Sequence, residues 1–293
     1  MKRSMSVLMM VFFLVAVKAG FTADPKKEAS EAEVKKVEEA MPAKATITPA
    51  KQRKMLVFNK CEGFYHDVIP LAAKAFEIMG KKTGAFEVVT SDDKSIFSSE
   101  KLKEFDAVLL NNTTGLKLSD DQKKALLSFV KEDGKGLIGT HAASDNFGDW
   151  PEGAAMVGGQ FDGHPWGGGG TWAVKIDDPE HPINKGFGGK GFKVKDEIYQ
   201  IKGAYSRETH RELLSLDMSD AETCKPKGQK RADKDNAISW IYDFGKGRVF
   251  YCSLGHNHEI YWNPAILQHY LDGIQFAFGD LKVDATPTAK VKK

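Results

Sequence analysis

The chain has 293 residues, of which 41% are hydrophobic and 28% charged, as is typical of a soluble globular protein with one sizeable core. The formal net charge of +2 hides an uneven distribution, because residues 54–280 contain 33 Asp and Glu against 28 Lys and Arg. A mildly acidic region lacks the basic face that nucleic acid requires, so we expect no nucleic-acid partner.

The N-terminus has the pattern of an export signal. Lys2 and Arg3 precede an apolar run over residues 5–17, and small residues follow near Ala19 and Ala23. This pattern predicts a secretory signal peptide over residues 1–23 and a periplasmic or secreted location, with an uncleaved anchor as the alternative. The run is shorter than the roughly 20 residues that cross a bilayer, so we expect no stable membrane span after processing.

Composition also suggests how the rest of the chain is divided. Residues 24–53 are rich in Lys, Glu, Ala and Pro with few aromatics, which predicts a disordered linker. Residues 281–293 are predicted to be a disordered basic tail by the same argument. The residues between them, 54–280, form the predicted domain.

Short apolar runs alternate with helical patterns in the first half of this domain. Apolar spacing predicts a helix over 68–82, and Ser119 with Gln122 forms a capping box for a helix that ends near 131. Strands are predicted over 55–58, 86–89, 105–110 and 136–139. Strands that alternate with helices predict an α/β protein with a parallel, doubly wound sheet.

The second half has a different pattern. Strands are predicted over 172–176, 213–216, 237–242 and 248–252, and a helix over 264–278 closes the domain. Gly245 to Gly247 predicts a hairpin turn between the last two strands. The three cysteines, Cys61, Cys224 and Cys252, allow one disulfide in an oxidising compartment, but the sequence does not give its pairing.

Three histidines follow predicted strands directly: His66, His141 and His256. Since the carboxyl ends of parallel strands share one rim, where ligands of such sheets bind, we expect these side chains to approach one another. Imidazole can act as an acid, a base or a metal ligand near neutral pH. A single such histidine is more often structural, but three at strand ends favour a functional site.

Other residues flank this expected rim. Asp145 and Glu197 are candidates to assist the histidines, and His164 precedes a glycine run that we interpret as a mobile flap. The run opens a strand and lacks Gly-Lys-Ser/Thr, so it is a poor candidate for a nucleotide loop. Structural roles are expected for the remaining histidines of turns, charged segments and the last helix: His181, His210 and His269.

Several segments of the predicted domain form a set of motifs: Gly63–His66, Gly139–Asp145, Trp150–Pro151, Gly158–Pro165, Asp178–Pro182, Asp196–Tyr199, and Gly245–Tyr251 followed by Leu254–His256. Jointly, these motifs resemble the trehalose-utilisation (ThuA-like) family over about 55 to 280. The Asp92–Lys103 and Cys224–Asp235 segments carry no family signal.

The resemblance implies a flavodoxin-like fold similar to class I glutamine amidotransferases, a three-layer sandwich with a mostly parallel central sheet. In those enzymes a strand-to-helix elbow carries a nucleophilic cysteine. Here His141 occupies the corresponding place and no cysteine is near it in the sequence. Glutaminase activity therefore loses its nucleophile, and we reject it.

The family's link to sugar utilisation implies a small-molecule carbohydrate ligand. Our leading hypothesis is a hydrolase or lyase that acts on a glycoside or keto-sugar, with His66 and His141 as acid/base groups assisted by Asp145 and Glu197. His164 and His256 would bind substrate or metal. The aromatic candidates for stacking on sugar rings, each equally suited to core packing, are Trp150, Trp166 and Tyr199.

A metal-dependent version and two other classes of function stay open. His66, His141 and His256 could hold a divalent metal such as zinc, although the sequence has no H-E-x-x-H motif. The alternative to an enzyme is a non-catalytic carbohydrate-binding domain or an accessory subunit of a sugar oxidoreductase. A structural envelope protein without a ligand is the third class. The sequence does not determine the oligomeric state.

Overall fold

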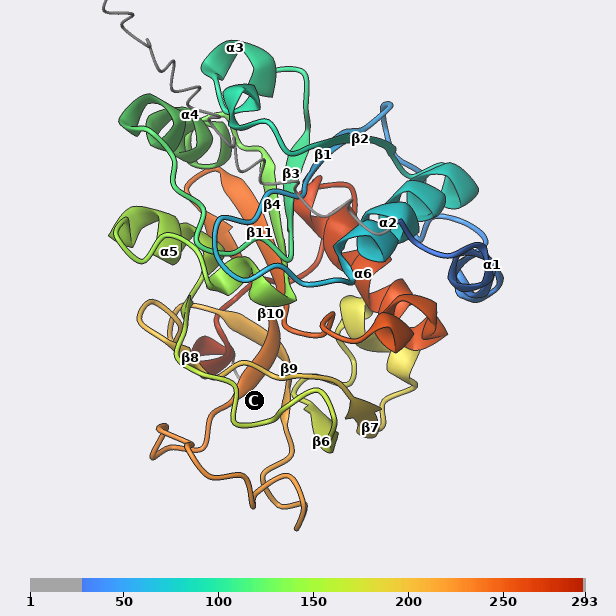
Figure 1. The fold of residues 1–293 in the computed structure, drawn as a ribbon, viewed down its shortest axis with the longest axis vertical. Coiled ribbons are helices and arrows are strands. Elements are labelled where there is room, and N and C mark those ends of the chain that lie inside the picture. The colour runs from blue at the N-terminus through green and yellow to red at the C-terminus, as the bar shows by residue number, and fades with distance from the viewer. Residues whose placement is uncertain (1–27, 292–293) are drawn as a thin grey trace, which may run out of the picture.

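Nine strands form one mixed sheet in the computed structural model, which describes residues 28–291 (Figure 1). These strands are β1 (Lys54–Phe58), β2 (Glu87–Ser91), β3 (Ala107–Asn111), β4 (Gly136–Thr140), β6 (Thr171–Ile176), β7 (Phe192–Lys195), β9 (Arg211–Leu216), β10 (Ala237–Phe244) and β11 (Gly247–Cys252). A separate two-stranded sheet pairs β5 (Gln160–Phe161) with β8 (Ile201–Lys202).

The spatial strand order is β2-β1-β3-β4-β11-β10-β9-β6-β7. The first five strands in this order are parallel to one another, which confirms the predicted parallel sheet. From β11 onward the pairing is antiparallel. The direction reverses because the two-residue turn Gly245–Lys246 joins β10 to β11 as the predicted hairpin, and Gly245 adopts a φ of +63° there.

Helices cover both faces of the parallel half, as Figure 1 shows. The α-helices are α1 (Glu31–Ala40), α2 (Ile69–Thr83), α3 (Ser99–Leu102), α4 (Asp120–Lys131), α5 (Pro151–Val157) and α6 (Pro264–Ala277). Short 3₁₀ turns complete the chain: η1 (Lys94–Ile96), η2 (His141–Ser144), η3 (Pro182–Phe187), η4 (His258–Trp262) and η5 (Thr288–Lys290). The predicted capping box of Ser119 and Gln122 is present at the start of α4.

The alternation of side chains along the strands divides the apolar residues between two layers. In β1, Met55 and Val57 pack with buried residues of α2 and α6 on one face. Leu56 and Phe58 pack with α4 and α5 on the other face. The result is the predicted α/β three-layer arrangement, with helices on both sides of a mixed central sheet.

The prediction of a disordered linker over 24–53 is wrong for residues 28–53. Helix α1 packs against α2 and η4, and its Val37 and the following Met41 are buried in the core. The Gln275 side chain on α6 then accepts hydrogen bonds from the amides of Thr46 and Ile47. A few apolar residues at the right spacing dock this segment although its average composition is polar.

The predicted disordered tail is also wrong for residues 281–291. Leu281 is buried, and the Thr288 amide donates to the His210 carbonyl at 2.9 Å. The Glu212 amide donates in turn to Thr288 Oγ at 2.8 Å. The segment therefore pairs with the start of β9 instead of extending into solvent.

The predicted signal peptide, residues 1–23, lies outside the described residues. Across 28–291, no helix has both the length and the apolar character needed to cross a bilayer. Cys224 is exposed and Cys252 is buried, and both carry free thiols, so neither contributes to a disulfide.

Candidate functional site

The rim at the carboxyl ends of β1, β4 and β11 brings three histidines together, as the strand order predicts. The ring centroids of His66 and His141 lie 5.0 Å apart, and each lies 5.4 Å from that of His256. All three pairs meet edge to face. His66 and His141 are buried, whereas His256 is partly exposed.

His141 lies at the sharp turn from β4 into η2, with a φ of +40°. Its ring Nδ1 is 2.8 Å from the Ser253 carbonyl, which can only accept a hydrogen bond, so Nδ1 carries the proton. The Tyr251 hydroxyl donates to the His141 backbone carbonyl at 2.6 Å. Gly255 packs between His141 and Tyr261. A Cβ at this position would lie 3.4 Å from the His141 Cβ and only 2.8 Å from the Tyr261 hydroxyl, which explains the glycine there.

Glu197 lies among the histidines, in the segment between β7 and β8. Its Oε2 is 3.6 Å from His141 Nε2 and 3.9 Å from His256 Nε2, and its Oε1 is 3.2 Å from His164 Nδ1. His164, whose side chain is 56% exposed, occupies the solvent side of this cluster. Of the two predicted acids, Glu197 is therefore the one in contact with the rim.

Burial and mutual proximity set the charges of this cluster. Burial, together with the nearby His141 and His256, lowers the pKa of His66 to about 3. Burial also lowers the pKa of His141, although Glu197 partly opposes it. Burial favours the protonated form of Glu197, but His141, His256 and His164 outweigh it and lower its pKa. Near neutral pH the site therefore combines neutral buried imidazoles with an ionised carboxylate.

Asp196 holds the loop that carries His256. Its buried carboxyl accepts hydrogen bonds of 2.7 Å from the amides of Gly255 and Asn257. Burial raises the pKa of this carboxyl to about 8, in spite of those two bonds. Asp196 was part of a sequence cluster without a predicted role, and its position next to Glu197 was the available signal.

Two of the three predicted stacking aromatics are wrong. Trp166 is 0% exposed, and its indole N–H donates to the Thr223 carbonyl in the core. Trp150 is buried at the start of α5 against Phe147. Their large apolar rings fill the core, so neither can present a face to a sugar. Tyr199 does line the site, with its ring centroid 4.4 Å from that of His141, but it too is buried.

Asp145 is close to the rim but is not part of the histidine cluster. Its backbone amide donates to Ala142 and its carbonyl accepts from Gly115, which fixes the end of η2. Among the described residues, no hydrogen bond or ion pair joins its carboxyl to the three rim histidines. The predicted role of assisting them directly is not supported by this geometry.

Polar residues at the end of β3 also lie at this rim, and none of them was predicted from the sequence. Asn111, Asn112, Thr113 and Thr114 are all fully buried. Thr114 Oγ donates to the Phe64 carbonyl at 2.6 Å, and its own carbonyl accepts from the amides of the His66 loop. A polar run directly after an apolar strand was the signal that could have identified them.

Two exposed aromatics next to His66 were also missed. The Phe64 side chain is 68% exposed and Tyr65 41%. The Phe64 ring contacts that of His66 edge to face at a centroid distance of 4.9 Å. Both belong to the Gly63–His66 motif, in which only the histidine was predicted to have a role.

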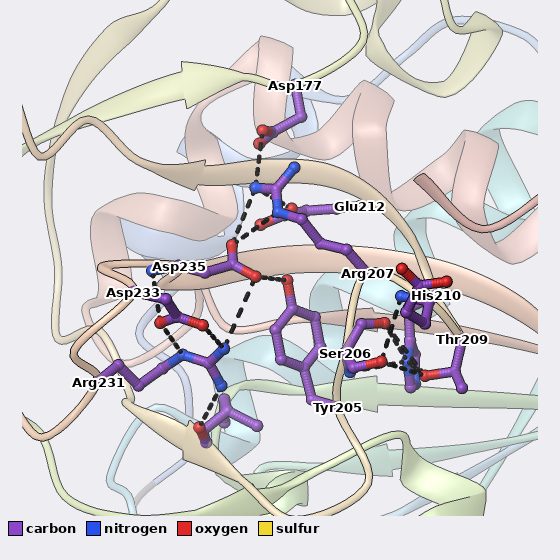
Figure 2. Close-up of polar contacts among 12 residues, drawn as sticks. Asp177, Tyr205, Ser206, Arg207, Thr209, His210, Glu212, Arg231, Asp233 and Asp235 are labelled. Atoms are coloured by element: carbon purple, nitrogen blue, oxygen red, sulfur yellow. Dashed lines mark hydrogen bonds and ion pairs between the residues drawn. The ribbon is translucent and has the colours of Figure 1, made fainter. Parts of the chain in front are cut away.

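The histidines expected to be structural have structural contacts. His269 lies between Ser239 and the Ile183 carbonyl, and His181 accepts from the Ile183 amide at the start of η3. Figure 2 shows His210 next to Ser206 and Thr209, which contact its ring Nδ1.

The same view shows how the Cys224–Asp235 segment is held (Figure 2). Asp235 accepts from the Tyr205 hydroxyl and pairs with Arg207, which also contacts Asp177 and buried Glu212. The Arg207 guanidinium thus contacts three carboxyl groups, and these contacts connect β9 to the Cys224–Asp235 segment.

Comparisons with known proteins agree with this architecture. Residues 54–277 match the family model described as ThuA, trehalose utilisation. A solved ThuA-like protein from Bacteroides uniformis is 21% identical with a TM-score of 0.63, over 84% of this chain and 99% of that one. Another from Parabacteroides merdae is 19% identical with a TM-score of 0.60, over 82% and 96%. No curated protein matches the chain. The structural similarities establish a shared fold.

Proposed function

Because the chain belongs to the ThuA family, described by trehalose utilisation, we propose that it is a hydrolase or lyase acting on a glycoside or keto-sugar. The observation that carries this proposal is the Glu197 carboxylate, which lies 3.2–3.9 Å from nitrogens of His141, His164 and His256. Cleavage of a glycosidic bond and elimination beside a keto group both require a proton to be removed from one atom and delivered to another.

The charge state of the cluster suits such proton transfers. His66 and His141 are neutral near pH 7 because burial lowers their pKa values, so both rings have a free nitrogen lone pair, and Glu197 favours protonation of His141. Ionised Glu197 stabilises the imidazolium that forms when His141 takes that proton. His164 and His256, which are more exposed, are placed to bind the substrate at the solvent side of the carboxylate.

The exposed rings of Phe64 and Tyr65 support a carbohydrate as the substrate. They lie next to His66 in the sequence, and Phe64 contacts its ring. Aromatic side chains present a flat apolar surface on which the apolar face of a sugar ring can stack. We assign to this pair the stacking role predicted for Trp150 and Trp166. The export pattern over residues 1–23 adds a periplasmic or secreted location to the proposal.

The test is turnover of a panel of glycosides and 3-keto-glycosides by the purified protein, followed by mass spectrometry. We expect Glu197→Gln to reduce kcat/KM by about 10²–10⁴ with an unchanged melting temperature. Glu132→Gln, an exposed position at the end of α4, is the matched control and should keep full activity.

Two results would contradict the proposed reaction. Sugar binding without turnover by the parent protein would favour the non-catalytic binding domain or accessory subunit. Absence of both binding and turnover across the panel would remove carbohydrate as the ligand class.

A further inference from the structure

Independently of the substrate, we propose that His66, His141 and Glu197 bind one divalent transition-metal ion, of which zinc is the representative. In the metal-bound protein these three side chains are ligands, so they bind the ion in place of the protons assigned to them in the proposed reaction. One ligand atom from each residue lies within 4.8 Å of the other two. The three side chains come from the loop after β1, the turn after β4 and the segment before β8. The fold therefore assembles this set from distant parts of the chain.

The tautomer of His141 provides the first argument. Its Nδ1–H donates to the Ser253 carbonyl, so the neutral ring has a bare lone pair on Nε2. That lone pair faces Glu197 Oε2 at 3.6 Å, which is too long for a hydrogen bond. Two electron-rich atoms that face each other in a buried site favour a cation between them.

The second argument is the lack of other partners. His66 Nδ1 and His141 Nε2 are both buried, and neither has a hydrogen-bond partner within residues 28–291. Buried polar atoms almost always have a partner, because an unpaired one costs about 1–3 kcal/mol. An ion that accepts the lone pair of His141 removes this cost for that ring and compensates the charge of Glu197.

The spacing of the ligand atoms fits such an ion. Donors about 2.0–2.1 Å from a tetrahedral ion lie about 3.4 Å from one another. The 3.6 Å between His141 Nε2 and Glu197 Oε2 is close to this value. The widest separation in the set, at most 4.8 Å, is longer than this value, so binding of the ion requires His66 and Glu197 to move closer together.

The donor types select the class of metal. Two imidazoles with one carboxylate are typical ligands of catalytic zinc, which keeps a fourth position open. Mg²⁺ and Ca²⁺ prefer sets of oxygen ligands, so they fit less well. From the sequence, His256 was the predicted third ligand beside His66 and His141. We replace it with Glu197, because the ligand atoms of His66, His141 and Glu197 all lie within 4.8 Å of one another and His256 is not part of this group.

The surroundings of the ligands match those of metal sites. Metal-binding histidines usually donate their second ring N–H to a carbonyl or carboxylate, which fixes the ring, and His141 does so to Ser253. The backbone of His141 is held in addition by the Tyr251 hydroxyl. Both contacts orient Nε2 toward Glu197.

The test uses the full chain, purified without a histidine tag. Zn²⁺ binding is measured by calorimetric titration, and the visible absorption spectrum is recorded after addition of Co²⁺. We expect one equivalent to bind and a ligand-field absorption that reports nitrogen and oxygen ligands. Glu197→Gln and His66→Phe should weaken Zn²⁺ binding at least tenfold, whereas Glu132→Gln should leave it unchanged.

The outcomes separate this proposal from the proposed reaction. The metal site is overturned if folded wild-type protein binds no stoichiometric Zn²⁺, or if both site variants fold and bind it as tightly as the parent. Zn²⁺ binding without turnover of any sugar supports the metal site while contradicting the sugar chemistry. Turnover of a sugar by protein that binds no stoichiometric Zn²⁺ contradicts the metal site while supporting the sugar chemistry.

Discussion

At the scale of single residues, the backbone conformation of each histidine determines where its ring points. His141 has a φ of +40°, in the left-handed region that residues other than glycine adopt at a cost of order 1–3 kcal/mol. The hydrogen bonds to Ser253 and from Tyr251 hold it there. The turn aims its ring at Glu197. His269, in contrast, lies in a regular helix, and its ring is enclosed by the core.

This enclosure predicts a pH-dependent contribution of His269 to stability. Burial lowers its pKa to about 3, below the ordinary 6.5. A group with a lowered folded-state pKa stabilises the fold fully above its unfolded pKa, and this contribution is lost as the pH falls from about 6.5 toward 3. By pH 5 the loss should reach about 2 kcal/mol.

The measurement is the difference in free energy of unfolding between the wild type and His269→Gln, by urea denaturation at pH 7 and pH 5. Taking the difference matters because burial raises the pKa of Glu212 to about 9, and this group changes stability in the opposite direction. The wild-type advantage should shrink at pH 5. An advantage that is equal at both pH values would contradict the prediction.

At the scale of elements, helix α1 shows why local composition misleads. Ser30 and Glu33 form a capping box at its start, and Val37 is fully buried against the core. Most of its other side chains are exposed, so the average hydrophobicity resembles that of a disordered segment. One buried residue and the following Met41 determine where the helix docks.

Val37→Ala should therefore lower the free energy of unfolding by about 1–3 kcal/mol, because it removes two buried methyl groups and leaves a cavity. Val34→Ala in the same helix is the matched control. Val34 is partly exposed, so its loss should be clearly smaller. Equal losses in urea denaturation would mean that α1 is not docked through Val37.

At the scale of the whole molecule, the first and last described segments both pack on the α/β domain. Residues 28–53 pack on α2 and α6, and residues 281–291 pair with the start of β9. A chain that stops after Asp280 loses buried Leu281 and the hydrogen bonds of Thr288. We expect this truncation to cost about 3 kcal/mol.

The matched control for that truncation is a chain that stops after Val291, which keeps every contact described for the tail. Thermal unfolding followed by circular dichroism should show a lower melting temperature only for the shorter chain. If both truncated chains melt like the full chain, the contacts of residues 281–291 do not contribute to stability.

The sequence was sufficient for the parts of the fold that follow from periodicity. Apolar runs identified all the parallel strands, and the rule that their carboxyl ends share one rim predicted the meeting of His66, His141 and His256. The rule could not give the position of Glu197, because its segment belongs to no parallel strand. It also could not separate a buried aromatic ring from an exposed one, since Trp166 and Phe64 both lie in polar, glycine-containing stretches.

The candidate site is complete only when both halves of the sheet have folded, because Glu197 and the two buried histidines come from different halves. His66 and His141 come from the parallel half of the sheet, whereas Glu197 arrives with the antiparallel half, far along the chain. A molecule in which only the first half had folded would have imidazoles at its edge without the facing carboxylate. Contacts between distant parts of a chain tend to form late, because closing the intervening loop costs entropy. An ion or sugar bound by both halves would therefore stabilise the completely folded protein relative to partly folded forms, because only the complete fold binds it.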